Sequence, residues 1–172
     1  MSEESTPEEV AVVESLDTAV LAVAAEEAPV EEQRPLAEAA KPDAGGFVWG
    51  TGRRKSAVAR VRIKPGSGIF HIKGKEVSDF FSEPQHQAQC LAPLKTCEME
   101  GKLDIYVNTH GGGITGQAGA VMLGLARALK GYDPTLEQKL RDENYLTRDP
   151  REVERKKYGQ RGARRKFQFS KR

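Results

Sequence analysis

Residues 103–131 read LDIYVNTHGGGITGQAGAVMLGLARALKG and predict a strand, a glycine turn and a long helix in succession. The first eight residues alternate apolar with polar side chains, which is the period of a strand with one buried face. After the three glycines, apolar residues recur at helical spacing from Ile114 to Leu129, and Gly131 is a typical helix end. Because a strand and a helix follow each other so closely, we expect them to share one core.

A second strand is predicted upstream, where apolar and basic residues alternate between residues 59 and 64. Its apolar residues would face the core, and Arg60, Arg62 and Lys64 would form a row of cations on the opposite face. The following KPGSG has the residues of a turn. We therefore expect Ile69–Lys73 to return as the second strand of a hairpin.

The remaining elements are expected to be helical. Apolar residues three and four apart predict brief helices over 76–81 and 84–91, and Asp133-Pro134 is a typical start for a further helix. Gly119 and Gly124 inside the long helix are expected to permit close approach to the sheet or to RNA. These elements predict a two-layer α/β (α+β) domain, with a small mixed sheet and helices on one of its faces.

Charge divides the chain into parts. Residues 1–46 carry twelve acidic and two basic side chains, whereas residues 47–172 carry twenty-five basic and thirteen acidic ones. The first part has no aromatic residue and too little apolar surface to offset the entropy of ordering it. We predict a disordered acidic extension at 1–46, a globular α/β domain at 47–147 and an extended basic tail at 148–172.

The tail carries the clearest functional signal. Residues 155–172 read RKKYGQRGARRKFQFSKR, with nine Lys or Arg and no Asp or Glu. Such a segment is attracted to phosphate, and Tyr158, Phe167 and Phe169 add rings on which unpaired bases can stack. This combination favours folded or single-stranded RNA over a DNA groove, although a solvated tail without a target is the alternative.

Motifs of catalysis and metal binding are missing from the sequence. The HGGG at 110–113 is accompanied by neither a GxSxG elbow nor a GxxxxGK[ST] loop, so it is either a tight turn or a site for an RNA phosphate. Cys90, Cys97 and the three histidines lack the spacing of metal ligands. We expect no enzyme, no metal, no cofactor and no small-molecule substrate. The acidic start and the short apolar run at 19–25 also predict no membrane segment.

Four separated motifs resemble one known family. They are GTGRRKSAVAR at 50–60, the glycines and helix of 111–129 with Gly116-Gln117 and Ala126-Arg127-Ala128-Leu129, TRDPREVERKK at 147–157 and QFSKR at 168–172. In this order they look like the ninth protein of the small ribosomal subunit, in its bacterial form. The resemblance runs from about Gly50 to the C-terminus, and the acidic extension has no counterpart in it.

The resemblance implies a structural, non-catalytic protein of the small-subunit head, bound to the 3′ major domain of ribosomal RNA among neighbouring head proteins. It also implies a left-handed βαβ crossover, which is an exception to the right-handed rule. By similarity, Ser170, Lys171 and Arg172 would reach the anticodon stem-loop of the transfer RNA in the peptidyl site. A cytoplasmic, ribosome-associated location follows. The alternative is a free-standing nucleic-acid-binding or RNA-chaperone protein outside the ribosome.

Charge pattern and resemblance together predict a set of RNA-binding residues: Arg53, Arg54, Lys55, Arg60, Arg62, Gly111, Gly112, Gly113, Gln117, Arg148, Arg155, Lys156, Lys157, Arg161, Arg164, Arg165 and Lys166. For the extension at 1–46, three interpretations stay open: a solubilising arm, which we favour, an internal mimic of RNA that shields the basic tail, or a contact with another protein.

Overall fold

The computed structural model describes residues 39–168 and contains a five-stranded mixed sheet in the order β1-β2-β5-β3-β4. The strands are β1 (Val48–Arg54), β2 (Ala57–Pro65), β3 (Phe70–Ile72), β4 (Lys75–Glu76) and β5 (Leu103–His110). Only the β3–β5 pairing is parallel among these strands. The predicted strand at 103–110 and the alternation along β2 are confirmed.

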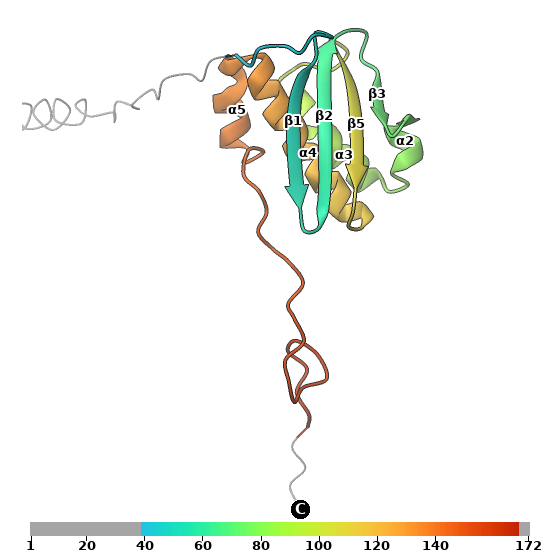
Figure 1. Ribbon diagram of the computed structural model, residues 1–172, viewed down its shortest axis with the longest axis vertical. Coiled ribbons are helices and arrows are strands. Elements are labelled where there is room, and N and C mark those ends of the chain that lie inside the picture. Colours follow the sequence, from blue (N-terminus) through green and yellow to red (C-terminus); the bar gives the residue numbers. More distant parts are fainter. Residues whose placement is uncertain (1–38, 169–172) are drawn as a thin grey trace, which may run out of the picture. The chain divides into compact units, whose positions relative to one another are not determined.

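The helices are α2 (Val77–Phe80), α3 (Pro84–Thr96), α4 (Ile114–Tyr132), the 3₁₀ turn η1 (Pro134–Leu136) and α5 (Glu137–Asp142). Figure 1 shows α3 and α4 behind the sheet formed by β1, β2 and β5. The predicted α+β architecture, with a mixed sheet packed against helices, is confirmed. The Asp133 side chain accepts a hydrogen bond from the Thr135 backbone N–H and so caps η1, as its position before a proline indicated.

The predicted hairpin of β2 with residues 69–73 is wrong. β3 pairs with β5 and β4, while β2 lies between β1 and β5. The true hairpin partner of β2 is β1. No strand was predicted there, because Gly50 and Gly52 occupy two of its three inward positions beside Val48. The left-handed sense of the connection from β3 to β5 stays a prediction.

The glycines of β1 let α4 lie directly on the strand. A Cβ added to Gly52 would come within 1.9 Å of the Ala120 carbonyl oxygen, and one on Gly50 within 2.2 Å of the Gly124 carbonyl oxygen. A Cβ on Gly124 would in turn lie 2.8 Å from Val61 Cγ2. The expected close approach of the long helix to the sheet is therefore confirmed at Gly124.

Candidate nucleic-acid interface

The face of the sheet opposite the helices carries the row of cations predicted on β2. Apolar residues of β2 are buried against α4, whereas Arg60 is exposed and Arg62 and Lys64 are half-buried on the other side. Strand pairing places Trp49 of β1 and Tyr106 of β5 on either side of Arg62. We call this surface the outer face of the sheet.

Aromatic rings alternate with the cations across the outer face. The Arg62 guanidinium carbon lies 5.1 Å from the Phe47 ring centroid, 5.9 Å from that of Trp49 and 5.3 Å from that of Tyr106. Arg60 lies 5.7 Å from the Trp49 ring. The cations of this face were predicted from the sequence, but the rings beside them were not, because Trp49 belongs to β1, where no strand was predicted, and Phe47 directly precedes β1.

The negative charge of one carboxylate on this face is compensated by groups within the fold. Asp104 is buried and accepts hydrogen bonds from the backbone N–H groups of Ser67 (2.8 Å) and Ile69 (3.3 Å), with Lys64 Nζ 3.8 Å away. Burial alone would raise the pKa of Asp104, but these two N–H groups and Lys64 outweigh it and lower the pKa. Asp104 therefore stays ionised and fixes the turn between β2 and β3.

Arg54, one of the predicted RNA-binding residues, points toward the helices instead. Its Nη2 forms an ion pair with Asp149 Oδ2 at 3.0 Å, and its Nη1 donates to the Thr115 carbonyl at 3.4 Å. Gly119 makes room for it, since a Cβ there would meet Arg54 Cδ at 2.3 Å. Arg54 thus attaches the start of the C-terminal segment to the domain, and it lines a pocket of about 190 Å³ together with Gly119 and Asp149.

The turn between β1 and β2 brings two further predicted residues together. Lys55 occupies this turn with a φ of 51° and an exposed side chain, and its carbonyl accepts a hydrogen bond from Arg148 Nη2 at 3.5 Å. Arg148 also lies 3.4 Å from Glu152 Oε1. The exposed side chain of Arg53 is on the outer face, as its register opposite Val58 requires.

The glycine turn before α4 has a structural requirement of its own. Gly111 and Gly112 have φ values of 72° and 63°, and a Cβ on Gly111 would meet the Ser56 carbonyl oxygen at 2.6 Å. Gln117 braces the same turn, because its Nε2 donates to the Gly111 carbonyl at 3.1 Å. Gly113 has an extended backbone and precedes the first turn of α4. Positive φ and close approach therefore account for Gly111 and Gly112, and the phosphate role of this turn stays a prediction.

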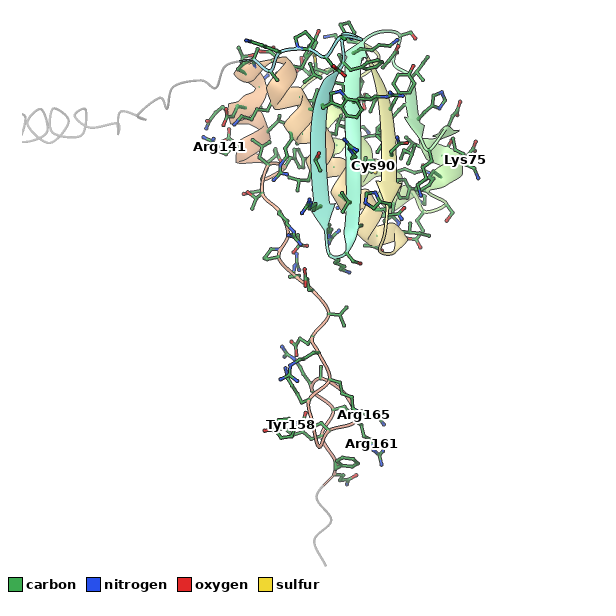
Figure 2. The ribbon with its side chains drawn as sticks, in the orientation of Figure 1. Lys75, Cys90, Arg141, Tyr158, Arg161 and Arg165 are labelled. Atoms are coloured by element: carbon green, nitrogen blue, oxygen red, sulfur yellow. The ribbon has the colours of Figure 1, made fainter. Side chains whose placement is uncertain are left out.

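From residue 148 to residue 168 the chain contains no helix or strand. Tyr158, Arg161 and Arg165, labelled in Figure 2, come from this segment and are exposed. Arg164 pairs with Glu154, which lowers the pKa of that carboxyl, and Arg161 lies 5.0 Å from the Phe167 ring centroid. Arg155, Lys156 and Lys166 are exposed and Lys157 is half-buried. The predicted transfer-RNA residues Ser170, Lys171 and Arg172 lie outside the described residues.

Residues 39–46 belong to the predicted extension, and part of this stretch contacts the domain. The Ala40 N–H donates to the Gly131 carbonyl at 2.8 Å, and the Asp43 N–H donates to the Phe47 carbonyl at 3.0 Å. Residues 1–38, which include most of the predicted disorder, lie outside the described residues.

Within residues 39–168, no three His, Cys, Asp or Glu side chains come together as metal ligands. Cys90 and Cys97 are buried free thiols, and burial raises the pKa of Cys90 to about 12. No helix in the same part of the chain is both long and apolar enough to cross a bilayer.

A mixed sheet with helices on one face, cations and rings on the other, and a cationic C-terminal segment are typical of an α+β protein that binds a polyanion. The model of the family described as ribosomal protein S9/S16 matches residues 52–172. The small ribosomal subunit protein uS9 of Picosynechococcus sp. is 54% identical over 125 residues, which cover 72% of this chain and 91% of that protein. The uS9 of Thermotoga maritima is 51% identical over 127 residues, which cover 72% of this chain and 95% of that protein.

The chain therefore belongs to the ribosomal protein S9/S16 family. The resemblance stated from the four motifs is confirmed, and the family is one of structural ribosomal proteins rather than enzymes. Residues 1–51 lie outside the family match, so the role of the acidic extension does not follow from it.

Proposed function

We propose that this chain is a structural component of the small ribosomal subunit that binds ribosomal RNA of the head, in the 3′ major domain. The globular domain supplies the outer face of the sheet, and the C-terminal segment supplies reach and charge. The last residues, Ser170 to Arg172, contact the anticodon stem-loop of the transfer RNA in the peptidyl site. Family membership supports the ribosomal part of this proposal, and the charge of the segment supports the RNA contacts.

The observation that carries the RNA role is the cationic C-terminal segment. Among the described residues, Arg164 has a carboxylate partner, whereas no ion pair involves Arg155, Lys156, Lys157, Arg161, Arg165 or Lys166. Cations that are not neutralised within the fold gain free energy by releasing counterions from RNA. Fully extended, the last eighteen residues span on the order of 60 Å, which is enough to leave the domain.

Sedimentation of cell lysate at moderate salt tests the ribosomal assignment. We expect one copy of the chain per small subunit, quantified by mass spectrometry across the gradient. A protein that binds RNA outside the ribosome would depend mostly on counterion release and would be stripped from the subunits as salt rises. Recovery only in the free fractions would favour that alternative.

Deletion of Ser170 to Arg172 tests the transfer-RNA contact. We expect subunits with the shortened chain to assemble normally and to bind peptidyl-site transfer RNA about tenfold more weakly, because a charge-assisted contact to phosphate is lost. Replacement of the same three residues by Gly-Ser-Gly keeps the length and serves as the control for charge. Wild-type transfer-RNA affinity in both variants would show that the end of the chain makes no such contact.

The proposal also covers the role of the acidic extension and the cellular location of the protein. We propose that residues 1–46 act as a solubilising arm, since a segment with twelve acidic and two basic side chains and no aromatic residue is strongly hydrated. A cytoplasmic location stays a prediction, and the sedimentation experiment above also shows whether the arm is retained in the mature particle.

A further inference from the structure

We infer that the outer face of the sheet is a stacking platform for unpaired RNA bases, centred on Trp49. The inference rests on the proposed function and makes it more specific, because it assigns the globular domain a base contact in addition to phosphate contacts. The platform consists of Phe47, Trp49, Tyr106 and His71, with the guanidinium groups of Arg60 and Arg62 between the rings.

The register of three strand pairings builds the platform. Trp49 is paired with Arg62, Arg62 with Tyr106, and Tyr106 with His71, so that these four side chains form one row across β1, β2, β5 and β3. The rings of Phe47 and His71 each have their centroids 6.2 Å from that of Tyr106. The Phe47 ring is edge-on to Tyr106, with 82° between their planes, and the His71 ring is tilted from Tyr106 by 41°. The surface therefore offers separate ring faces at different angles, on which individual unpaired bases can stack.

The platform is accessible. Trp49 is 45% exposed, and Phe47, Tyr106 and His71 are half-buried. Helices α3 and α4 lie on the other side of the sheet (Figure 1). Sheet faces turned to water usually carry polar residues, so several rings on such a face indicate a surface that is covered in the assembled state.

The charge of the outer face indicates which kind of ligand binds there. Arg53, Arg60, Arg62 and Lys64 all belong to this face, and Asp104, beside Lys64, is buried and held by backbone N–H groups. The face therefore attracts a polyanion. An acidic peptide would satisfy the cations but would leave the rings without stacking partners, whereas unpaired RNA supplies phosphates and bases together.

A ladder of cation–π pairs that only stabilises the sheet is the competing explanation for the same contacts. It accounts for the position of Arg62 between the rings, yet it requires no exposed indole surface. The two explanations differ in what happens to Trp49 when RNA binds, and this difference can be measured directly.

The chain has one tryptophan, so intrinsic fluorescence reports on Trp49 alone. The full chain is titrated with a 5′-labelled twelve-nucleotide oligouridine, and both the anisotropy of the label and the emission of the indole are recorded. A duplex RNA of the same length and a polyglutamate peptide are the comparison ligands. We expect the single strand to quench Trp49 strongly by stacking, and the duplex and the peptide to bind with little quenching.

Variants then measure how much the platform contributes to affinity. We expect Trp49→Ala to weaken binding of the single strand about tenfold and Trp49→Phe to restore most of it, because the ring rather than the indole N–H stacks. Arg62→Gln should weaken binding more than Lys139→Gln, which removes the same charge from the exposed surface of α5. Chemical denaturation of each variant shows whether its domain is folded.

The outcomes separate this inference from the proposed function. Binding seen by anisotropy without any change in Trp49 emission would overturn the platform and leave the RNA role of the C-terminal segment intact. Equal quenching by polyglutamate would also overturn it and would indicate an acidic protein partner. If the single strand does not bind at all, both this inference and the RNA contacts of the proposed function fail.

Discussion

At the level of single residues, glycines set the distance between the long helix and the sheet. Three glycines lie at this contact: Gly50 and Gly52 on β1, and Gly124 on α4. A Cβ on any of them would overlap atoms of the facing element, including its backbone. The requirement is steric at these three positions, since none of them has a positive φ. The GTG that opens the family resemblance thus has a packing reason in this fold.

Replacement of Gly52 by alanine should be strongly destabilising. The new Cβ would lie 1.9 Å from the Ala120 carbonyl oxygen and 2.4 Å from the Gly124 nitrogen, and both are backbone atoms that cannot rotate away. We expect Gly52→Ala to lower the free energy of unfolding by about 3 kcal/mol in urea denaturation. Gly113→Ala is the control, because nothing lies within 4 Å of its Cβ; since Gly113 is the N-cap residue of α4, its loss should be about 1 kcal/mol at most. Equal losses in both variants would contradict the packing argument.

The lowered pKa of Asp104 predicts a pH-dependent contribution to stability. A carboxyl whose pKa is lower in the folded state stabilises the fold above its unfolded pKa of about 3.9, and this contribution disappears as pH falls through the folded value. The difference in unfolding free energy between wild type and Asp104→Asn should therefore be full at neutral pH and shrink below about pH 4. Stability curves that stay parallel between pH 7 and pH 3 would refute this assignment.

At the level of elements, Arg54 connects three of them. It comes from the end of β1, donates to the first turn of α4 at Thr115, and pairs with Asp149 beyond α5. Asp149 also accepts a hydrogen bond from the Arg151 backbone N–H. This bond, together with the side chains of Arg151 and Arg54, lowers the pKa of Asp149. The start of the C-terminal segment is thereby fixed to the domain by ionised groups.

Loss of Arg54 should release that start. We expect Arg54→Gln to increase the rate of tryptic cleavage after Arg148 several-fold under native conditions, because the Asp149 anchor is lost. Arg127→Gln is the control, because it removes an equal charge whose guanidinium donates to the Thr51 carbonyl of β1 instead of binding Asp149. We expect this variant to leave the bond after Arg148 protected. The cleavage rates of wild type and both variants are followed by mass spectrometry. Equal rates in wild type and Arg54→Gln would show that the ion pair does not restrain the segment.

The elements also show where pattern analysis succeeds and where it fails. β5, α4 and the alternation of β2 could be predicted, because each is long and strongly periodic. The hairpin partner of β2 could not be predicted from the sequence, because the choice between β1 and residues 69–73 depends on which strand α4 covers. The missing Cβ atoms of Gly50 and Gly52 made β1 look like a loop, although they are the reason that α4 packs on it.

At the level of the whole molecule, the domain and the C-terminal segment contribute to RNA affinity in different ways. The segment carries nine cations between residues 155 and 172, whereas the platform adds rings as well as charge. Affinity from the segment should therefore be sensitive to salt and indifferent to sequence, and affinity from the platform should depend on unpaired bases.

Deletion of residues 155–172 should reduce the salt dependence of RNA binding. With about 0.7 counterions released per phosphate contact on single strands, loss of nine cations should make the slope of log K against log salt less negative by up to about 6. Lys139→Gln, a single charge on α5, should change it by less than about 1. Titrations of single-stranded RNA at several salt concentrations measure both slopes. An unchanged slope after the deletion would mean that the segment makes no phosphate contacts.

The sequence by itself determined the class of fold, the division of charge along the chain and the family, because periodicity, composition and motif order are properties of the linear chain. The tertiary structure decided the strand order, the inward position of Arg54 and the rings of the outer face. Each of these depends on pairings between residues far apart in sequence, such as Trp49 with Arg62 and Arg54 with Asp149. Such pairings form only when α4 packs onto β1 and β2 and fixes their register, and no local pattern contains that information.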